Sequence, residues 1–184
     1  MTISLSDDET LAWQARVDGN AFAELYRRYA TRVYRYHLIR TGNVKDAEDL
    51  TSQTFLAALG ALKHYRRDGS FAAWLMGIAR RQAALFFRRR KPETFLENIG
   101  DLPAPFPATE LQVSRRISFQ QAYAGLQKIS PERAEAIVLA VFGGLSLAET
   151  AQVLGKSVAA VKMLISRGLE DLRTRTLLAL EVEA

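Results

Sequence analysis

A basic stretch runs from Lys63 to Lys91 and holds nine Lys or Arg residues against one acid, Asp68. At its start, cations alternate with aromatic rings over a few consecutive residues. Cations can bind successive phosphates, and rings can stack on unpaired bases at about 1 to 3 kcal/mol per base. The stretch therefore predicts a site for single-stranded nucleic acid, with a solvated basic face around a packed tyrosine as the alternative. The candidate contacts are Lys63, His64, Tyr65, Arg66, Arg67, Arg80 and Arg81.

A second cationic surface is predicted near the end of the chain. Ser146 can cap a short helix that ends before Gly155, and Ser157 can then cap a long helix through about Leu180. This is the helix-turn-helix pattern, whose second helix enters the major groove of duplex DNA, and a plain helical hairpin is the alternative. The residues expected to pack inside are Leu147, Thr150, Ala151, Leu154, Val158, Val161 and Ile165. The residues expected on the outward face that contacts DNA are Ser157, Ala159, Ala160, Lys162, Met163, Ser166 and Arg167.

A third candidate surface is acidic and polar. On the helix predicted over about 43–62, Asp46, Asp49 and Gln53 lie on the face opposite the apolar residues. Leu56 adds apolar surface beside them. Mixed faces of this kind can dock another protein, although simple solvation is the commoner role. The hypothesis is that Asp46, Asp49, Gln53 and Leu56 bind a protein partner.

The sequence offers little for catalysis. It has no cysteine, which excludes thiolate chemistry and Cys-ligated zinc, and its two histidines, His37 and His64, stand far apart. Asp46, Glu48 and Asp49 are close in sequence, but neighbouring positions on a helix point in different directions. We therefore expect no metal site, no cofactor and no enzymatic activity.

Composition favours a folded protein with a polyanionic partner. The 184 residues are 48% hydrophobic and 24% charged, as in ordinary globular domains. The net charge of +5 favours nucleic acid ahead of a membrane surface. The first ten residues are acidic where a signal peptide would be basic, and no apolar run reaches the roughly 18 residues of a membrane span. We expect a cytoplasmic protein that does not insert into membranes.

Helices must hold these surfaces, because no segment shows the alternating apolar pattern of a strand. Four of the five prolines fall within 92–107, where helical periodicity is also lost. The fold class expected is all-α, with two small helical domains joined by an extended linker. The domains are 1–91 and 112–184, the linker is 92–111, and the second domain contains the helix-turn-helix.

Capping residues indicate where the helices begin. In the first domain, Asn20 can cap a helix that ends near Gly42, and Asn43 can cap a second through about Leu62. Ser70 can cap a third helix, which ends in the basic run at 88–91.

The second domain begins with a helix expected near 112–127. Ser130 is a cap candidate for the next helix, and Pro131 suits its first position. That helix should run to Phe142, where two glycines stop it.

Three runs follow one another in a fixed order, with the linker before the last. They are DAEDLTSQTFLAAL (46–59), SFAAWLMGIARRQAALFFRRRK (70–91) and ISPERAEAIVLAVFGGLSLAETAQVLGKSVAAVKMLISRGLEDLR (129–173). Together they resemble an extracytoplasmic-function sigma factor of bacterial RNA polymerase, a member of the sigma-70 family. The resemblance covers nearly the whole chain and includes the two-domain plan.

The resemblance implies a promoter-specificity subunit without cofactors. Its first domain corresponds to sigma region 2, in which Asp49, Gln53 and Leu56 would bind the clamp helices of the largest polymerase subunit. The turn at 63–70 and the helix after it would capture melted non-template bases of the minus-ten element. The second domain corresponds to region 4, which would bind the minus-thirty-five element as duplex, with the polymerase flap region as a further contact. The linker would thread toward the RNA exit path, and an anti-sigma factor is a possible partner.

The chain departs from the family's pattern on the outward face of the last helix. Met163 and Leu164 stand where family members often carry a polar residue followed by arginine, and Gly168 stands where a small helix former is usual. We therefore expect fewer hydrogen bonds to base edges here. A glycine inside a helix also costs about 1 kcal/mol relative to alanine, which predicts a looser helix end.

Two other functions are compatible with the pattern. One is a dimeric repressor or activator on palindromic operators, with the first domain as a dimerisation or sensing module. The other is a module that binds only proteins, such as an inhibitory partner. A monomer that retains core polymerase would support the sigma factor, whereas a polymerase-indifferent dimer would support the repressor or activator.

Overall fold

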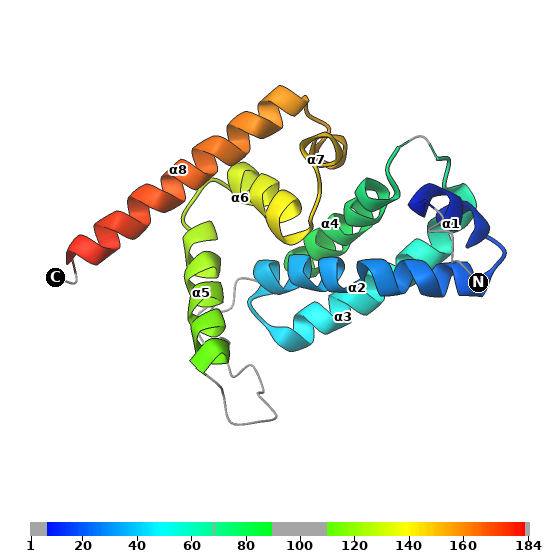
Figure 1. Ribbon diagram of the computed structural model, residues 1–184, viewed down its shortest axis with the longest axis horizontal. Coiled ribbons are helices and arrows are strands. Elements are labelled where there is room, and N and C mark those ends of the chain that lie inside the picture. The colour runs from blue at the N-terminus through cyan, green and yellow to red at the C-terminus, as the bar shows by residue number, and fades with distance from the viewer. Residues whose placement is uncertain (1–6, 68, 90–109, 183–184) are drawn as a thin grey trace.

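The computed structural model describes residues 7–67, 69–89 and 110–182, and side chains in the last range from 118 to 174. Every regular element within those ranges is a helix, so the all-α fold class is confirmed. The helices form an N-terminal unit (7–67 and 69–89) and a C-terminal unit (110–182), which lie side by side (Figure 1). The predicted linker lies almost entirely outside the described residues.

The N-terminal unit contains four α-helices and a short 3-10 turn. They are α1 (Asp8–Gln14), α2 (Gly19–Thr41), α3 (Val44–Ala61), the 3-10 turn η1 (Leu62–His64) and α4 (Phe71–Arg89). α2 and α3 form a hairpin, and α4 packs against both (Figure 1). Their apolar faces bury Leu25, Val33, Tyr36, Leu50 and Leu75. Helix α1, which the sequence analysis did not predict, packs against α2 and α4.

Local sequence explains most helix ends in this unit. The side chain of Asp18, not Asn20, caps α2 and accepts the Asn20 N–H at 2.8 Å, so the predicted start was slightly late. Asn43 caps α3 as predicted and accepts the Asp46 N–H at 3.0 Å. Gly42 ends α2 at φ 66°, a left-handed conformation that glycine adopts without steric penalty.

The C-terminal unit carries the predicted helix-turn-helix. Its elements are α5 (Glu110–Leu126), α6 (Pro131–Ile137), the π-helix η2 (Val138–Phe142), α7 (Leu147–Leu154) and α8 (Val158–Val182). Pro131 begins α6 as predicted, but Ser130 makes no side-chain capping bond. Ser146 and Glu149 form a reciprocal capping box on α7, which ends at Gly155 with φ 63°.

The packing of the helix-turn-helix follows the predicted pattern only in part. Thr150, Ala151 and Val161 are buried as expected, whereas Leu147 and Val158 are exposed. These two residues begin α7 and α8 respectively, and the first turn of each helix extends beyond the packed region.

Gly168 lets α8 pack closely on α6. A Cβ atom at this position would lie 2.7 Å from Ile137 Cδ1 and 3.2 Å from Arg133 Cβ. The missing side chain thus allows a close contact in the middle of the helix, and the expected loosening of the end of α8 stays a prediction. Glycine lowers the intrinsic helix propensity at this position, but it permits the close approach of α8 to α6.

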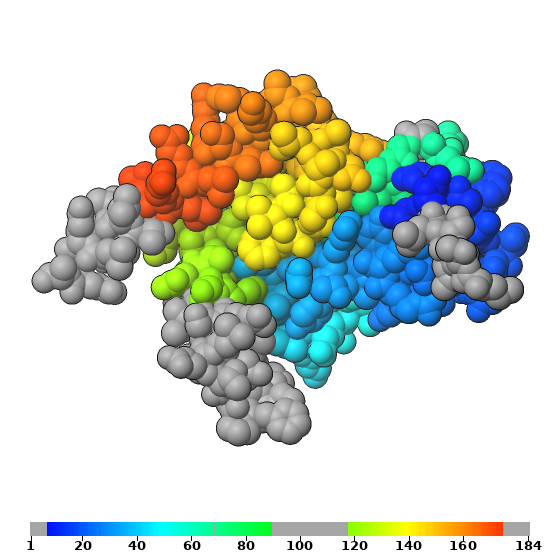
Figure 2. Space-filling view, in the orientation of Figure 1, coloured from blue at the N-terminus to red at the C-terminus, as the bar shows by residue number. Residues whose placement is uncertain are grey.

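The two units share one continuous apolar core. Helix α7 packs on α4, and the π-helix packs on α2. Figure 2 shows the second contact, where the yellow surface meets the blue one. Leu139 and Leu145 from the C-terminal unit belong to the same buried cluster as Val33 and Met76. The sequence pattern predicts two bodies connected by a linker and does not predict this contact.

Candidate nucleic-acid and protein interfaces

The turn after α3 presents the exposed cations that a nucleic-acid contact requires. Lys63, His64, Arg66 and Arg67 are all exposed. Arg67 has a positive φ of 55°, and its guanidinium donates to Thr10 Oγ1 at 3.2 Å. This bond attaches the basic turn to α1.

The ring of Tyr65, expected to stack on bases, lies instead in the core. Tyr65 is only 4% exposed, and its ring packs edge-on against Phe71 and Trp74 at centroid distances of 5.9 and 5.2 Å. An aromatic ring at the end of an amphipathic helix gains more from burial among other rings than from exposure. Phe71 is buried, whereas Trp74 is only partly buried. In this structure the base platform predicted at Tyr65 is therefore closed to nucleic acid.

Glu135 of α6 joins the two units through three side chains of the N-terminal unit. It is only 8% exposed and accepts a hydrogen bond from the Tyr36 hydroxyl at 2.8 Å. Its carboxylate lies 3.2 Å from Arg40 Nη1 and 3.6 Å from Arg80 Nε. Burial, together with the neighbouring carboxylate of Glu135, raises the pKa of Tyr36 well above its usual value. Arg80, a predicted single-strand contact, therefore lies against a carboxylate in this arrangement.

Sequence reasoning missed Glu135, although a signal was present. It is the one acid in the apolar run AEAIVLAVF, residues 134–142. A charged residue on the buried face of a helix requires a partner of opposite charge or a hydrogen bond. The pattern could have predicted an ionic contact, but not which residues provide it.

A cleft of about 690 Å³ lies between α4 and the C-terminal unit. Trp74 and Arg81 of α4 face it, together with Gln152 of α7. Glu135 also lines it with its partners Arg40 and Arg80, so basic, acidic and aromatic groups meet in one hollow. The cleft brings Arg80 and Arg81 together with Trp74, but it does not include the exposed cations of the turn at 63–67.

A second polar contact ties the start of α4 to α7. The Ser70 hydroxyl donates to Glu149 Oε1 at 2.5 Å, and it also accepts the Ala73 N–H at 3.4 Å, as expected of a helix cap. Burial raises the pKa of Glu149, but the hydrogen bonds from Ser70 and Ser146 outweigh it, so the pKa is lowered overall. The capping box of α7 thus also serves the contact between the units.

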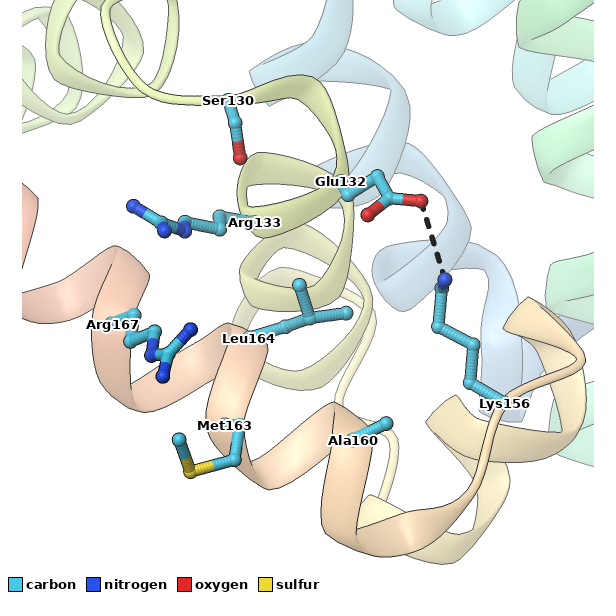
Figure 3. Close-up of a pocket in the computed structure, with 8 residues that line it drawn as sticks. All are labelled: Ser130, Glu132, Arg133, Lys156, Ala160, Met163, Leu164 and Arg167. Carbon is cyan, nitrogen blue, oxygen red and sulfur yellow. Dashed lines mark hydrogen bonds and ion pairs between the residues drawn. The ribbon is translucent and has the colours of Figure 1, made fainter.

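The predicted reading face of α8 is open to solvent. Every residue of the predicted set is exposed except Ala160, which is partly buried. Beside this face lies a hollow of about 390 Å³, drawn in Figure 3. Its lining residues are Ser130, Glu132, Arg133, Lys156, Ala160, Met163, Leu164 and Arg167. The helix therefore presents both cationic and apolar side chains outward.

The outer face of α3 is mixed in character, as predicted. Asp49 and Gln53 are exposed, Asp46 is partly buried, and Leu56 is 68% exposed. Leu59, one turn further along, is also exposed and was not singled out from the sequence. The two leucines enlarge the apolar part of this face.

The histidines do not form a metal site. His37 is fully buried, with Nε2 located 2.9 Å from Thr54 Oγ1. Burial lowers the pKa of His37 to about 3, and the charge of Arg40 acts in the same direction. Within the part of the chain that the structure describes, no three His, Cys, Asp or Glu side chains gather around a common point. None of the helices described there has the length and apolar character of a membrane span.

Comparison with known proteins identifies the family. Residues 25–93 match Sigma-70 region 2, and residues 119–172 match Sigma-70, region 4. RNA polymerase sigma factor CnrH of Cupriavidus metallidurans is 34% identical over 171 residues, which cover 87% of this chain and 89% of CnrH. ECF RNA polymerase sigma factor BldN of Streptomyces coelicolor is 35% identical over 158 residues. The chain belongs to the sigma-70 family, in its extracytoplasmic-function group.

The chain is shorter than some sigma factors that it resembles. The match to BldN covers 84% of this chain but 60% of BldN. For ECF RNA polymerase sigma factor SigE of Mycolicibacterium smegmatis, 34% identical, the shares are 82% and 59%. The chain thus spans about three fifths of these two relatives, whereas it matches most of CnrH.

Solved sigma factor structures share the arrangement of both units. The structure of CnrH in complex with the cytosolic domain of CnrY superposes with a TM-score of 0.70 at 26% identity, covering 96% of this chain and 99% of that one. The sigma factor RpoE of Bartonella quintana, in complex with the anti-sigma factor NepR, has a TM-score of 0.65 at 21% identity and shows the same fold. It covers 83% of this chain and 94% of that one. The region 2 match spans α2 to α4, and the region 4 match includes α6 to the middle of α8.

Proposed function

We propose that this sigma-70 family protein is a promoter-specificity subunit, which directs RNA polymerase core enzyme to promoters and captures melted non-template DNA. One observation carries the proposal: a region 2 unit with an exposed basic turn and a region 4 unit with an open helix-turn-helix face occur in one chain. The protein has no catalysis of its own in this proposal. It acts in the cytoplasm with the polymerase.

The C-terminal unit binds the upstream promoter element as duplex DNA. Ser157, just before α8, and the exposed face of α8 up to Arg167 enter the major groove. Lys162 and Arg167 provide positive charge on that face, which favours approach to the phosphates.

The N-terminal unit captures the melted downstream element. Lys63, Arg66 and Arg67 bind phosphates of the single strand, and His64 offers an exposed ring. Arg80 and Arg81 extend this basic surface along α4. Tyr65 supports the turn from within the core instead of contacting a base. Capture of extruded bases shifts the duplex toward the open form without nucleotide hydrolysis.

The outer face of α3 binds core polymerase. The exposed leucine Leu56 provides apolar contact area, and Asp46, Asp49 and Gln53 provide polar contacts around it. The clamp helices of the largest subunit are the proposed partner, with the flap region as a contact for the C-terminal unit. The proposed division is 1–91 for region 2, 92–111 for the linker and 112–184 for region 4.

An inhibitory protein is a further proposed partner. CnrH, which shares the fold of both units, was solved in complex with the cytosolic domain of CnrY. An anti-sigma factor of that kind would bind this chain while its two units are packed together.

In vitro transcription tests the proposed function. Purified protein is added to bacterial core polymerase on genomic DNA of the organism that encodes it, and RNA 5′ ends are sequenced. We expect start sites that require the protein, and a monomer that retains core polymerase in size-exclusion chromatography. A polymerase-indifferent dimer, or no protein-dependent start while a second sigma factor activates the same core, would refute the proposal.

A further inference from the structure

Three residues of α8 share one exposed side of the helix. Ala160, Met163 and Arg167 are spaced by three and four positions, which places them on one face, and all three line the hollow beside α6 (Figure 3). Met163 is 49% exposed and points away from the packed interior. Leu164 is partly buried and lies between α8 and α6 (Figure 3). Met163 and Leu164 are the two apolar residues that depart from the family's pattern, and of these Met163 is therefore the one available to a ligand.

Two cations around this hollow already have partners of opposite charge. Lys156 Nζ lies 3.2 Å from Glu132 Oε1, and Arg133 Nη1 lies 2.5 Å from Asp171 Oδ2. These pairs hold the two side chains at the edge of the hollow. On the reading face itself, Ala160 and Met163 provide apolar surface, whereas Lys162 and Arg167 provide positive charge.

We infer that Met163 binds the C5 methyl group of a thymine in the upstream duplex, an inference that rests on the proposed function. The thymine methyl is the one apolar group that base pairs present in the major groove. The small side chain of Ala160, one turn earlier, leaves space for the base edge to approach. Selection at this base pair thus arises from methyl packing instead of a hydrogen bond.

The same side chain disfavours the other bases at that position. A thioether has no hydrogen to donate and is a weak acceptor. Against the amino group of cytosine or the carbonyl oxygen of guanine, Met163 would remove water without replacing its hydrogen bond. The apolar contact therefore provides discrimination as well as affinity.

Deoxyuridine, which differs from thymidine only by the missing methyl, gives the test. Holoenzyme of the full chain with bacterial core polymerase first selects its upstream sequence from promoter DNA randomised in that region. Each thymine of the selected element is then replaced singly by deoxyuridine. We expect at least one replacement to weaken binding about fourfold, the value for one buried methyl-sized group. Holoenzyme carrying Met163→Gln should bind the two DNAs equally.

Two further variants control for the chemistry of the side chain. Met163→Leu keeps the apolar surface and should retain the preference for thymidine over deoxyuridine. Leu169→Gln removes a side chain of similar exposure, 48%, on another face of α8 and should also retain it. Equal binding of both DNAs by the unmodified protein, or the same preference in Met163→Gln, would overturn the inference while initiation stays intact. Absence of any selected element and of any initiation would instead refute the proposed function, and this inference with it.

Discussion

The exposed face of α8 and the basic side of α4 differ in how far the rest of the molecule occupies them. The face of α8 from Ala159 to Arg167 is exposed except at Ala160, which is partly buried, and α8 packs on α5, α6 and α7 of its own unit. The basic side of α4, which carries Arg80 and Arg81, lies partly against the C-terminal unit, because Arg80 faces Glu135. Ser70, just before α4, is also bonded to Glu149. The face of α8 is therefore accessible to a ligand, whereas Arg80 on α4 already contacts a carboxylate of the same chain.

The difference shows that positively charged side chains have two roles in this fold: some pair with a carboxylate of the chain, and others are available to phosphate. A carboxylate and a phosphate bind a guanidinium through similar charge-assisted hydrogen bonds. Nucleic acid that approaches Arg80 must therefore compete with Glu135, whereas nucleic acid that approaches Lys162 competes only with water and salt. In the turn at 63–67, exposed cations surround a buried ring, so the two kinds of surface meet within a few residues.

Replacing Tyr65 should mainly reduce stability, whereas replacing its neighbour Arg66 should mainly slow open-complex formation. Tyr65→Ala removes a buried ring packed on Phe71 and Trp74, and we expect the free energy of unfolding to fall by about 3 kcal/mol. Arg66→Ala removes an exposed cation and should change it by less than about 0.5 kcal/mol, while it slows open-complex formation by the holoenzyme. Urea unfolding and permanganate footprinting measure the two effects. Equal stability losses would show that the ring is not part of the core.

The buried histidine should make the fold sensitive to acid. Burial holds the pKa of His37 at about 3, whereas an unfolded histidine titrates near 6.5. Below pH 6.5 the unfolded chain binds a proton that the folded chain does not, so stability falls as the pH decreases from about 6.5 toward 3. At pH 5 the loss from this group is about 2 kcal/mol relative to pH 8.

Urea unfolding at pH 8 and pH 5 checks this sensitivity. His37→Gln should lower stability at both values but remove this part of the difference between them. His64→Gln, in the exposed turn, should leave the difference in place. A pH dependence that His37→Gln does not reduce would contradict the assignment to the buried imidazole.

Removing the carboxylate between the units should have a smaller effect. Glu135→Ala leaves the buried Tyr36 hydroxyl and Arg40 without their acceptor, and we expect a loss of about 1 to 2 kcal/mol. Arg80 is half exposed and can turn to water, which limits the loss. Glu132→Ala, on the exposed side of α6, should lose less than about 1 kcal/mol. Equal losses for the two variants in urea unfolding would show that the buried position of Glu135 has no influence.

Periodicity and capping chemistry predicted most of the fold. Asn43, Ser146 and Gly155 mark helix boundaries through bonds that involve only near neighbours, so the sequence is sufficient to locate them. Helix α1 was missed because it is short and lies in an acidic segment with little apolar periodicity. The Asp18 cap was missed because two candidate caps stand close together, and only packing decides between them.

The residues of the candidate interfaces could be named from the sequence, but their exposure and their partners were harder to predict. Exposure on α8 and α3 follows from helical spacing, and the structure agrees for most positions. Tyr65 was misplaced because a ring in a basic turn has the same local sequence whether it stacks on bases or on Phe71 and Trp74. Contacts between distant segments, such as Glu135 with Tyr36, depend on how two units meet, and no local pattern contains that information.

Removing one cation from each of the two proposed DNA-binding surfaces should distinguish them. Lys162 is exposed on the reading face of α8, and Lys63 is exposed in the turn of the N-terminal unit. Lys162→Ala should reduce the salt dependence of holoenzyme binding to upstream duplex by about one counterion and leave unfolding free energy unchanged. Lys63→Ala should leave that salt dependence unchanged and instead reduce it for open-complex formation. The opposite result is that each variant alters the salt dependence of duplex binding and of open-complex formation equally. That result would mean that the two surfaces contact the same DNA segment, and the separate roles proposed for α8 and the basic turn would be wrong.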